Sequence, residues 1–179
     1  MKTFREFLRE SKKDRIYKEN QNILVEFLEE LNVYMDYHDK ERLNKIYNLT
    51  KDTSLIEDIP VAYRVQCEQK EYKYKHKFIS FSKEKLKGKV LHGIIEDFKH
   101  LYKVHDGIKD CKIVYLEIQN AKGISVIDII SDGLKRGSFL NEFIKENIPH
   151  IFDTFKRLKP EKEILVLNKN LQIKNKEYL

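Results

Sequence analysis

The chain has 179 residues, a formal net charge of +6, 41% hydrophobic residues and 36% charged residues. This length is enough for one ordinary domain with a small addition, and the composition supports a packed core under a charged surface, which excludes a wholly disordered chain. No stretch approaches the roughly 20 apolar residues of a membrane-spanning helix, so we expect no membrane partner.

The positive charge and the cysteines set further expectations. Lysines recur through residues 70–89 and near the C-terminus. Such a pattern is typical of a solvated surface, and it would also attract a polyanion such as the NAD phosphates or a nucleic acid. The two cysteines, Cys67 and Cys111, predict free thiols in a reducing compartment. The six histidines form no metal-ligand pattern, so we predict no metal.

The first ten residues read MKTFREFLRE, and their apolar side chains share one helical face. They resemble the capsid-targeting leaders of internal head proteins of large tailed bacteriophages, which begin Met-Lys-Thr-aromatic and end at Leu/Ile-x-Glu. The resemblance implies that residues 1–10 are a cleavable leader and that the protein lies in the virion interior before it reaches the host cytoplasm. The alternative is an ordinary amphipathic helix, which Ser11 and the following charged residues end.

An N-terminal helical region is predicted over residues 11–58. A stripe of Ile23, Leu24, Phe27, Leu28 and Leu31 predicts a helix over residues 19–32, and a second helix is predicted over 40–48. Pro60 suits the first position of a strand, so we place the start of a second domain, 59–179, at this point.

Residues 59–179 predict an α+β domain, because strands are interrupted by one long helix and then by a helical insertion. The expected elements, in chain order, are strand 61–67, strand 77–82, helix 84–104, strand 112–119, a short apolar element 124–131, helices 138–147 and 149–158, and strands 163–167 and 170–174. The long helix has a predicted buried face of Val90, Ile94, Ile95, Phe98, Leu101 and Tyr102.

Three polar motifs lie on or beside these strands. Tyr63-Arg64 lies in the first strand, Ser80 and Ser82 share one face of the second, and Glu161-Lys162-Glu163 leads into the fourth. A guanidinium can bind a phosphate through two parallel hydrogen bonds, a hydroxyl can donate and accept, and a carboxylate can stabilise a cation.

In this order the motifs resemble those of the Arg-Ser-Glu class of mono-ADP-ribosyltransferases, over residues 59 to 174. The resemblance implies an ADP-ribosyltransferase-like split β-sheet core and NAD as the substrate. It implies that Arg64 holds NAD together with Ser80, Ser82 and Tyr63, although Tyr63 is also expected to point into the core. Glu163 and Ser80 would be catalytic, and Glu161 would orient an arginine of a host protein, for which the transcription or translation machinery is a natural class.

Each motif also has an ordinary interpretation. Arg64 could pair with a surface acid, Ser82 could cap the following helix, and residues 161–163 could form a charged turn before an exposed strand. The spacing from Arg64 to Ser80 is shorter than is usual in the family, and that from Ser80 to Glu163 is longer. The NAD cleft would then be covered by other elements, such as the 138–158 helices.

Two functions follow. The first is an NAD-dependent mono-ADP-ribosyltransferase, encoded by a bacteriophage and acting on arginine of host proteins. The second is a non-enzymatic basic internal virion protein that binds nucleic acid or inhibits a host factor. A glycine-rich dinucleotide motif, a P-loop and a Gly-x-Ser-x-Gly elbow do not occur in the sequence, which disfavours a redox enzyme, an NTPase and an esterase.

Overall fold

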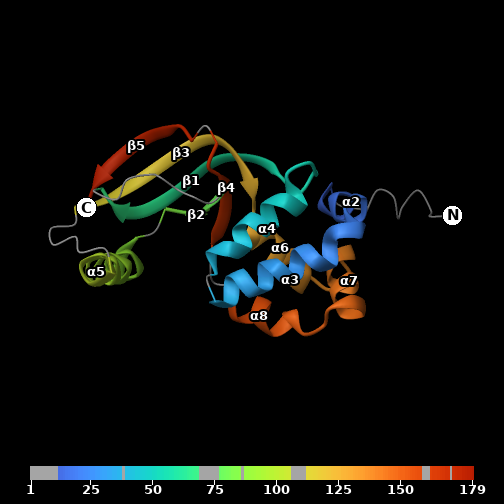
Figure 1. Ribbon diagram of the computed structural model, residues 1–179. Coiled ribbons are helices and arrows are strands. Elements are labelled where there is room, and N and C mark those ends of the chain that lie inside the picture. The colour runs from blue at the N-terminus through green and yellow to red at the C-terminus, as the bar shows by residue number, and fades with distance from the viewer. Residues whose placement is uncertain are drawn as a thin grey trace. The chain divides into compact units, whose positions relative to one another are not determined.

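The computed structural model describes residues 12–37, 39–68, 77–85, 87–105, 112–158, 162–169 and 171–179. The predicted leader therefore lies outside the described residues. Within them the fold is α+β, with helices near the N-terminus and a five-stranded antiparallel sheet with further helices between the strands (Figure 1). The α+β prediction is confirmed. None of the helices in the described part of the chain is both long and apolar enough to cross a membrane.

The chain divides into two compact units. A helical unit comprises Met1–Glu57 and Ile124–Glu161, and a sheet unit comprises Asp58–Gly123 and Lys162–Leu179. The residues between Ile124 and Glu161, which the sequence groups with the strands, thus cluster with the N-terminal helices.

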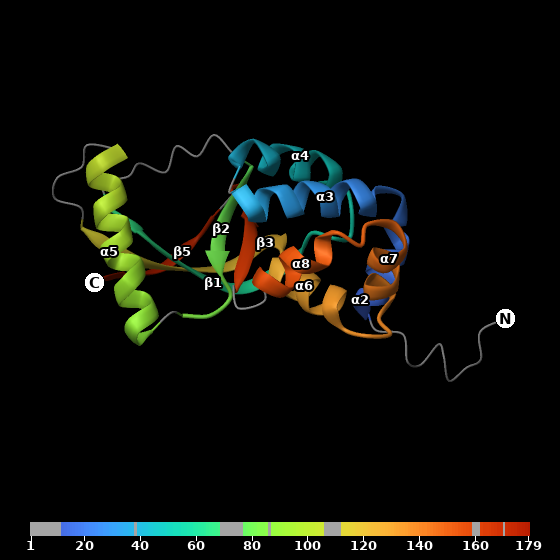
Figure 2. The same ribbon diagram turned by 90° about the horizontal axis from the view of Figure 1, so that it is seen from below.

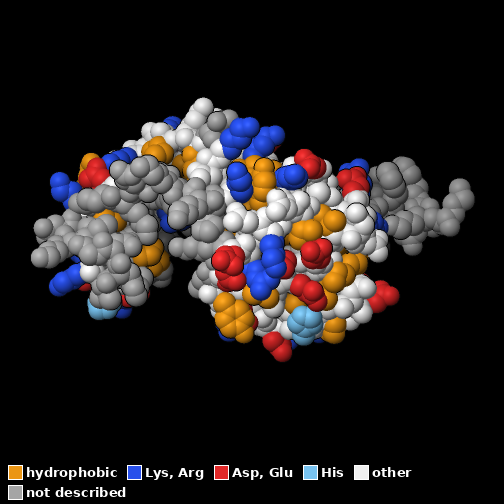
Figure 3. Space-filling view, viewed as in Figure 1, with side chains coloured by type: hydrophobic (Ala, Val, Ile, Leu, Met, Phe, Trp, Pro, Cys, Tyr) orange, Lys and Arg blue, Asp and Glu red, His pale blue; other side chains and the backbone are white. Residues whose placement is uncertain are grey.

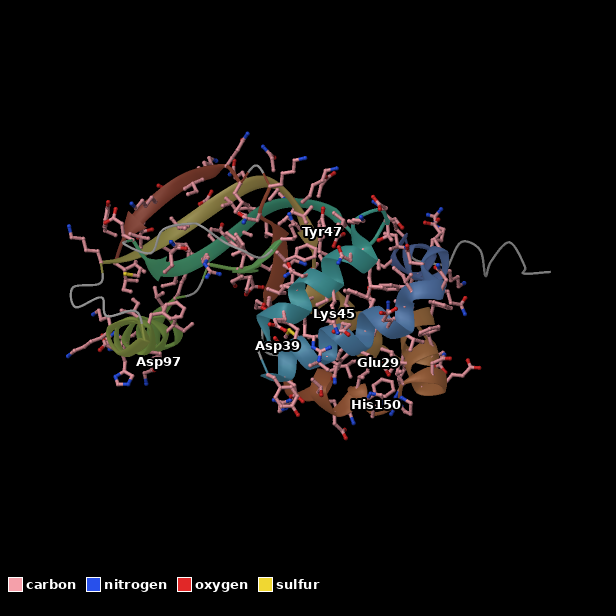
Figure 4. The ribbon with its side chains drawn as sticks, in the orientation of Figure 1. Glu29, Asp39, Lys45, Tyr47, Asp97 and His150 are labelled. Atoms are coloured by element: carbon pink, nitrogen blue, oxygen red, sulfur yellow. The ribbon has the colours of Figure 1, made fainter. Side chains whose placement is uncertain are left out.

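The helical unit contains six described helices: α2 (Lys12–Glu19), α3 (Gln21–Tyr37), α4 (Lys40–Thr50), α6 (Val126–Leu134), α7 (Phe139–Asn147) and α8 (Ile151–Leu158). Helix α3 buries Leu24, Phe27, Leu28 and Leu31, as its 3.6-residue pattern predicts, while Ile23 is half-buried. The helix extends beyond the predicted end at residue 32 and also buries Tyr34 and Met35. Asp39, labelled in Figure 4, caps α4 by accepting a hydrogen bond from the Glu41 amide at 3.0 Å. The short apolar element predicted at 124–131 forms most of α6.

Charges of both signs are interspersed on the surface of this unit (Figure 3). Glu30 of α3 accepts from Arg42 at 2.9 Å and pairs with Lys45 at 3.3 Å, both on α4. The Arg42–Glu30 pair is partly buried, whereas the Lys45 side chain is exposed, and exposed ion pairs contribute little stability. The basic residues of α4 are thus partly matched by acidic ones, as expected of a solvated surface.

The sheet unit contains β1 (Glu57–Cys67), β2 (Phe78–Ser82), α5 (Gly88–His105), β3 (Ile113–Ile124), β4 (Glu163–Leu167) and β5 (Ile173–Tyr178). The strand order is β1-β2-β4-β3-β5, with an additional pairing between β1 and β3. Because β1 and β3 stand at the first and fourth places in this order, their pairing requires the sheet to curl back on itself. Pro60 is exposed at the fourth position of β1, so the prediction that it begins the strand is wrong.

Hydrophobic clusters lie on the two faces of this curled sheet. Alternation along β1 puts Ala62 on one face with a cluster that includes Ile79, Phe81 and Val166. The other face carries Val65 with Ile113 and Tyr115, covered by Leu91, Ile94, Ile95 and Phe98 of α5. Figure 2 shows α5 beside the strands of this unit. The predicted inward positions Ile94, Ile95 and Phe98 are therefore confirmed.

Cys67 ends β1, where it is buried and disulfide-bonded. The prediction of two free thiols is therefore wrong for this residue, and Cys111 lies outside the described residues. The end of β1 adjoins the start of β3, where the Glu68 amide donates to the Lys112 carbonyl at 2.8 Å. Sequence spacing does not reveal this proximity of residues more than forty positions apart.

Candidate functional site

The three strands that carry the predicted motifs are consecutive neighbours in the sheet. β1 carries Arg64, β2 carries Ser80 and Ser82, and β4 begins with Glu163. β2 lies between the other two and pairs antiparallel with both, and Figure 1 shows β2 and β4 side by side. Polar positions far apart in the sequence are thus brought to adjacent strands.

The strand register places four of the predicted residues on one face. Tyr63 lies directly across from Ser82, and Ser82 lies directly across from Glu163. Ser80 lies two residues from Ser82 on β2 and therefore shares its face. Cross-strand partners have Cβ atoms about 4.5–5.5 Å apart. We call this row of Tyr63, Ser80, Ser82 and Glu163 the Ser–Glu face; all four side chains are half-buried.

Ser82 also stabilises the turn that follows β2. Its hydroxyl donates to the Glu84 carbonyl at 2.8 Å and lies 3.3 Å from the Glu84 amide. Helix α5 begins only at Gly88, so Ser82 does not cap that helix and this alternative is wrong. The hydroxyl of Ser82 therefore takes part in a local turn, and its oxygen has a second lone pair that can accept a hydrogen bond.

Glu163 is the first residue of β4, and the chain around it is joined to the turn after β2. The Lys83 amide donates to the Lys162 carbonyl at 2.7 Å, and Lys162 pairs with Glu84 at 3.3 Å. Glu163 is therefore held in a strand by backbone pairing rather than in a charged turn. Glu161 lies outside the described residues, so its predicted role stays a prediction.

Arg64 lies on the opposite face. Alternation separates it from Tyr63, and its guanidinium carbon is 5.9 Å from the ring centroid of Phe81, a core residue that points away from Ser80 and Ser82. Arg64 Nη1 donates to the backbone carbonyl of Ser80. The structure thus brings Arg64 to the strand that carries Ser80, but not to the Ser–Glu face, and its predicted contact with NAD stays a prediction.

Tyr63 packs into the sheet unit, as predicted. Its ring centroid is 5.9 Å from that of Tyr115, within the cluster that α5 covers. Tyr115 lies across from Glu177 of β5, which is the last strand in the order of the sheet. A row of contacting residues thus runs from Tyr63 through Tyr115 to Glu177. Lys85 pairs with Glu177 at 2.6 Å and lies 5.1 Å above the Tyr115 ring. The hydrogen bond to Glu177 raises the pKa of Lys85.

Sequence reasoning did not single out Gln66. Its side chain is 1% exposed, and its Oε1 accepts from Arg64 Nε at 3.2 Å. A buried amide two residues from a strand arginine is a recognisable pattern, because positions i and i+2 share a face. Gln66 could have been found in this way.

The helical unit contains a separate small cavity of about 10 Å³. It is lined by Lys13, Tyr17, Glu57 and Ser125, among others, and the buried Ser125 hydroxyl has no hydrogen-bond partner. This volume is roughly that of one water molecule, so the cavity is too small for a nucleotide.

No family model, no curated protein and no solved structure matches the chain. Among the described residues, no three His, Cys, Asp or Glu side chains are grouped closely enough to hold a metal ion. The chemistry of the Ser–Glu face therefore has to be argued from its own residues. Two hydroxyls and a carboxylate on one face can bind the hydroxyls of a sugar and stabilise positive charge beside it.

Proposed function

We propose that this protein is an NAD-dependent mono-ADP-ribosyltransferase whose catalytic groups lie on the Ser–Glu face. The observation that carries the proposal is the strand register: Glu163 lies directly across from Ser82, with Ser80 on the same face and Tyr63 next in the row. The curled sheet, in which β1 pairs with both β2 and β3, is compatible with the split sheet that the sequence resemblance implies.

In this proposal Glu163 acts on the ribose attached to nicotinamide. Its carboxylate accepts a hydrogen bond from the ribose 2′-hydroxyl. The bond between ribose C1′ and the nicotinamide nitrogen then breaks, and its electron pair leaves with nicotinamide. The fixed negative charge stabilises the oxocarbenium character that develops on the sugar, an effect present chiefly in the transition state.

The acceptor completes the transfer. A nitrogen lone pair of an arginine guanidinium on another protein forms the new bond to C1′, and that nitrogen loses its proton to solvent. Ser80 supplies a hydroxyl that can bridge Glu163 and the ribose. Glu161 orients the acceptor in this scheme, since a carboxylate and a guanidinium can form two parallel hydrogen bonds.

The test is nicotinamide release from NAD by the full chain. We predict that Glu163→Gln lowers the rate about 10²-fold or more, because it removes the charge and keeps the shape. Glu29→Gln is the matched control, since Glu29 is exposed on α3 (Figure 4), and it should leave the rate unchanged. Equal rates for the wild-type protein and Glu163→Gln would show that Glu163 is not catalytic.

A further inference from the structure

A partly buried hydrogen-bond chain lies behind the Ser–Glu face. Gln66 is 1% exposed, and its Oε1 accepts from Arg64 Nε at 3.2 Å. Arg64 Nη1 donates in turn to the backbone carbonyl of Ser80 on the neighbouring strand. The chain therefore crosses from β1 to β2 on the face opposite to the Ser80 hydroxyl.

The guanidinium makes this chain directional. Its N–H groups are fixed in one plane, so an acceptor at Nε sets the direction in which Nη1 donates. Gln66 therefore aims Arg64 at the Ser80 carbonyl. Phe81 supports the same arrangement, with its ring centroid 5.9 Å from the guanidinium carbon.

Restraining the Ser80 carbonyl also restrains the direction in which its side chain leaves the backbone. The carbonyl belongs to the peptide plane that follows Ser80, and the orientation of that plane sets the direction of the Cα–Cβ bond out of the pleat. In the pairing of β1 with β2, Tyr63 lies across from Ser82. The hydrogen bond from Arg64 to the Ser80 carbonyl is therefore a second connection between the two strands, next to Ser80.

We propose that Gln66 is a positioning residue: through Arg64 it holds the Ser80 backbone so that the Ser80 hydroxyl keeps its place on the face that carries Glu163, one cross-strand pair away. The proposal rests on the proposed transferase function. It assigns Arg64 a role behind the site, in place of a direct contact with NAD. If the proposal holds, Arg64 and Gln66 act on kcat through the same hydrogen-bond chain, so that losing either one has the same effect as losing both.

The kinetic test uses Gln66→Met, which keeps the side-chain length and removes the acceptor. We expect kcat for nicotinamide release to fall roughly 10- to 100-fold while KM for NAD stays within about twofold, because misplacement affects the transition state more than binding. Gln66→Glu retains an acceptor oxygen and should restore most of kcat. Gln119→Met, at a half-buried strand glutamine elsewhere in the sheet, is the matched control.

Arg64→Lys decides between the two roles of the arginine. If Arg64 acts through Ser80, this variant lowers kcat as Gln66→Met does, and the double variant is no worse than either single variant. A large rise in KM for Arg64→Lys with kcat unchanged would mean direct binding of NAD and would overturn the proposal. So would a Gln66→Met protein with wild-type kcat.

A second measurement separates this proposal from the transferase function. The carbonyl ¹³C resonance of Ser80 reports its hydrogen bond, and it should move in Gln66→Met and stay near its wild-type position in Gln66→Glu and Gln119→Met. An unmoved resonance in Gln66→Met overturns the proposal whatever the activity. A wild-type protein that releases no nicotinamide, with the resonance moving as expected, refutes the transferase function and leaves the structural role of Gln66 in place.

Discussion

Tyr17 and Asp132 form a polar pair inside the helical unit. Tyr17 is 1% exposed, and its hydroxyl donates to Asp132 Oδ2 at 2.9 Å. Burial is the main cause that raises the pKa of Tyr17, and the charge of Asp132 adds to it. Burial likewise raises the pKa of Asp132 above its ordinary value of 3.8, although the hydrogen bond from Tyr17 and the charge of Lys13 oppose this.

The raised pKa of Asp132 predicts a pH dependence of stability. Above the ordinary carboxyl pKa and up to the raised folded-state pKa, the folded protein binds more protons than the unfolded chain, so the free energy of unfolding falls as pH rises. Asp132→Asn keeps an acceptor for Tyr17 and cannot ionise. The variant should therefore gain stability relative to the wild-type protein as pH rises through this window.

Urea unfolding of both proteins at a series of pH values measures this difference. Glu29→Gln, at an exposed position of α3, controls for the loss of one charge in the same unit. Parallel stability curves for the wild-type protein and Asp132→Asn would mean that Asp132 titrates alike in the folded and unfolded chains.

At the level of elements, most helices and strands could be predicted from local pattern. Among the described helices, α6 is predicted only as a short apolar element, and α2, which the sequence leaves as a polar break, is not predicted as a separate helix. Its charged residues are anchored by distant partners: Lys13 pairs with Glu57 at 2.7 Å, and Asp14 accepts from the Phe139 amide at 3.1 Å. A local window cannot reveal partners 44 and 125 residues away.

Strand β3 shows a second limit of local pattern. The sequence predicts its end at residue 119. The strand instead continues to Ile124, with a register shift between Glu117 and Ile118 and a left-handed φ of 52° at Asn120. An irregular strand of this kind can change partners along its length.

Gly123 marks the place where β3 approaches β4. A Cβ atom built on it would lie 2.2 Å from the Leu165 carbonyl oxygen, a backbone atom that cannot move aside. Gly123→Ala should therefore destabilise the protein by about 1–3 kcal/mol or more, measured by denaturant unfolding. Wild-type stability in this variant would contradict the close approach of the two strands.

Gly93 provides the matched control, because a Cβ atom there would meet nothing within 4 Å. It lies inside helix α5, where alanine is favoured over glycine by roughly 0.5–1 kcal/mol. Gly93→Ala should therefore be as stable as the wild-type protein or more stable. The opposite signs of the two substitutions distinguish a steric clash from a general effect of replacing glycine.

At the scale of the whole molecule, the sequence predicted which residues lie in strands but not which strands are neighbours. Alternation correctly placed Ser80 and Ser82 on one face of β2, whereas the adjacency of β1, β2 and β4 is seen only in the structure. The face of Arg64 depends on the register between β1 and β2, which long-range pairing sets. The grouping of residues 124–161 with the N-terminal helices is likewise a tertiary property.

The net charge of +6 does not by itself decide between the two functions. NAD phosphates and nucleic acid would both be attracted to it. Binding of nucleic acid would weaken steeply with salt, whereas the proposed cleavage of NAD depends on the uncharged hydroxyls and the carboxylate of the Ser–Glu face. A measurement that locates the ligand residue by residue is therefore more decisive than one of affinity.

Amide chemical-shift mapping shows residue by residue whether NAD binds at the Ser–Glu face. The experiment titrates NAD into the isotope-labelled Glu163→Gln protein, which should bind without turnover. We predict saturable shifts concentrated at Ser80, Ser82 and Ile164. Shifts confined to the helical unit, or no shifts at millimolar NAD, would contradict it.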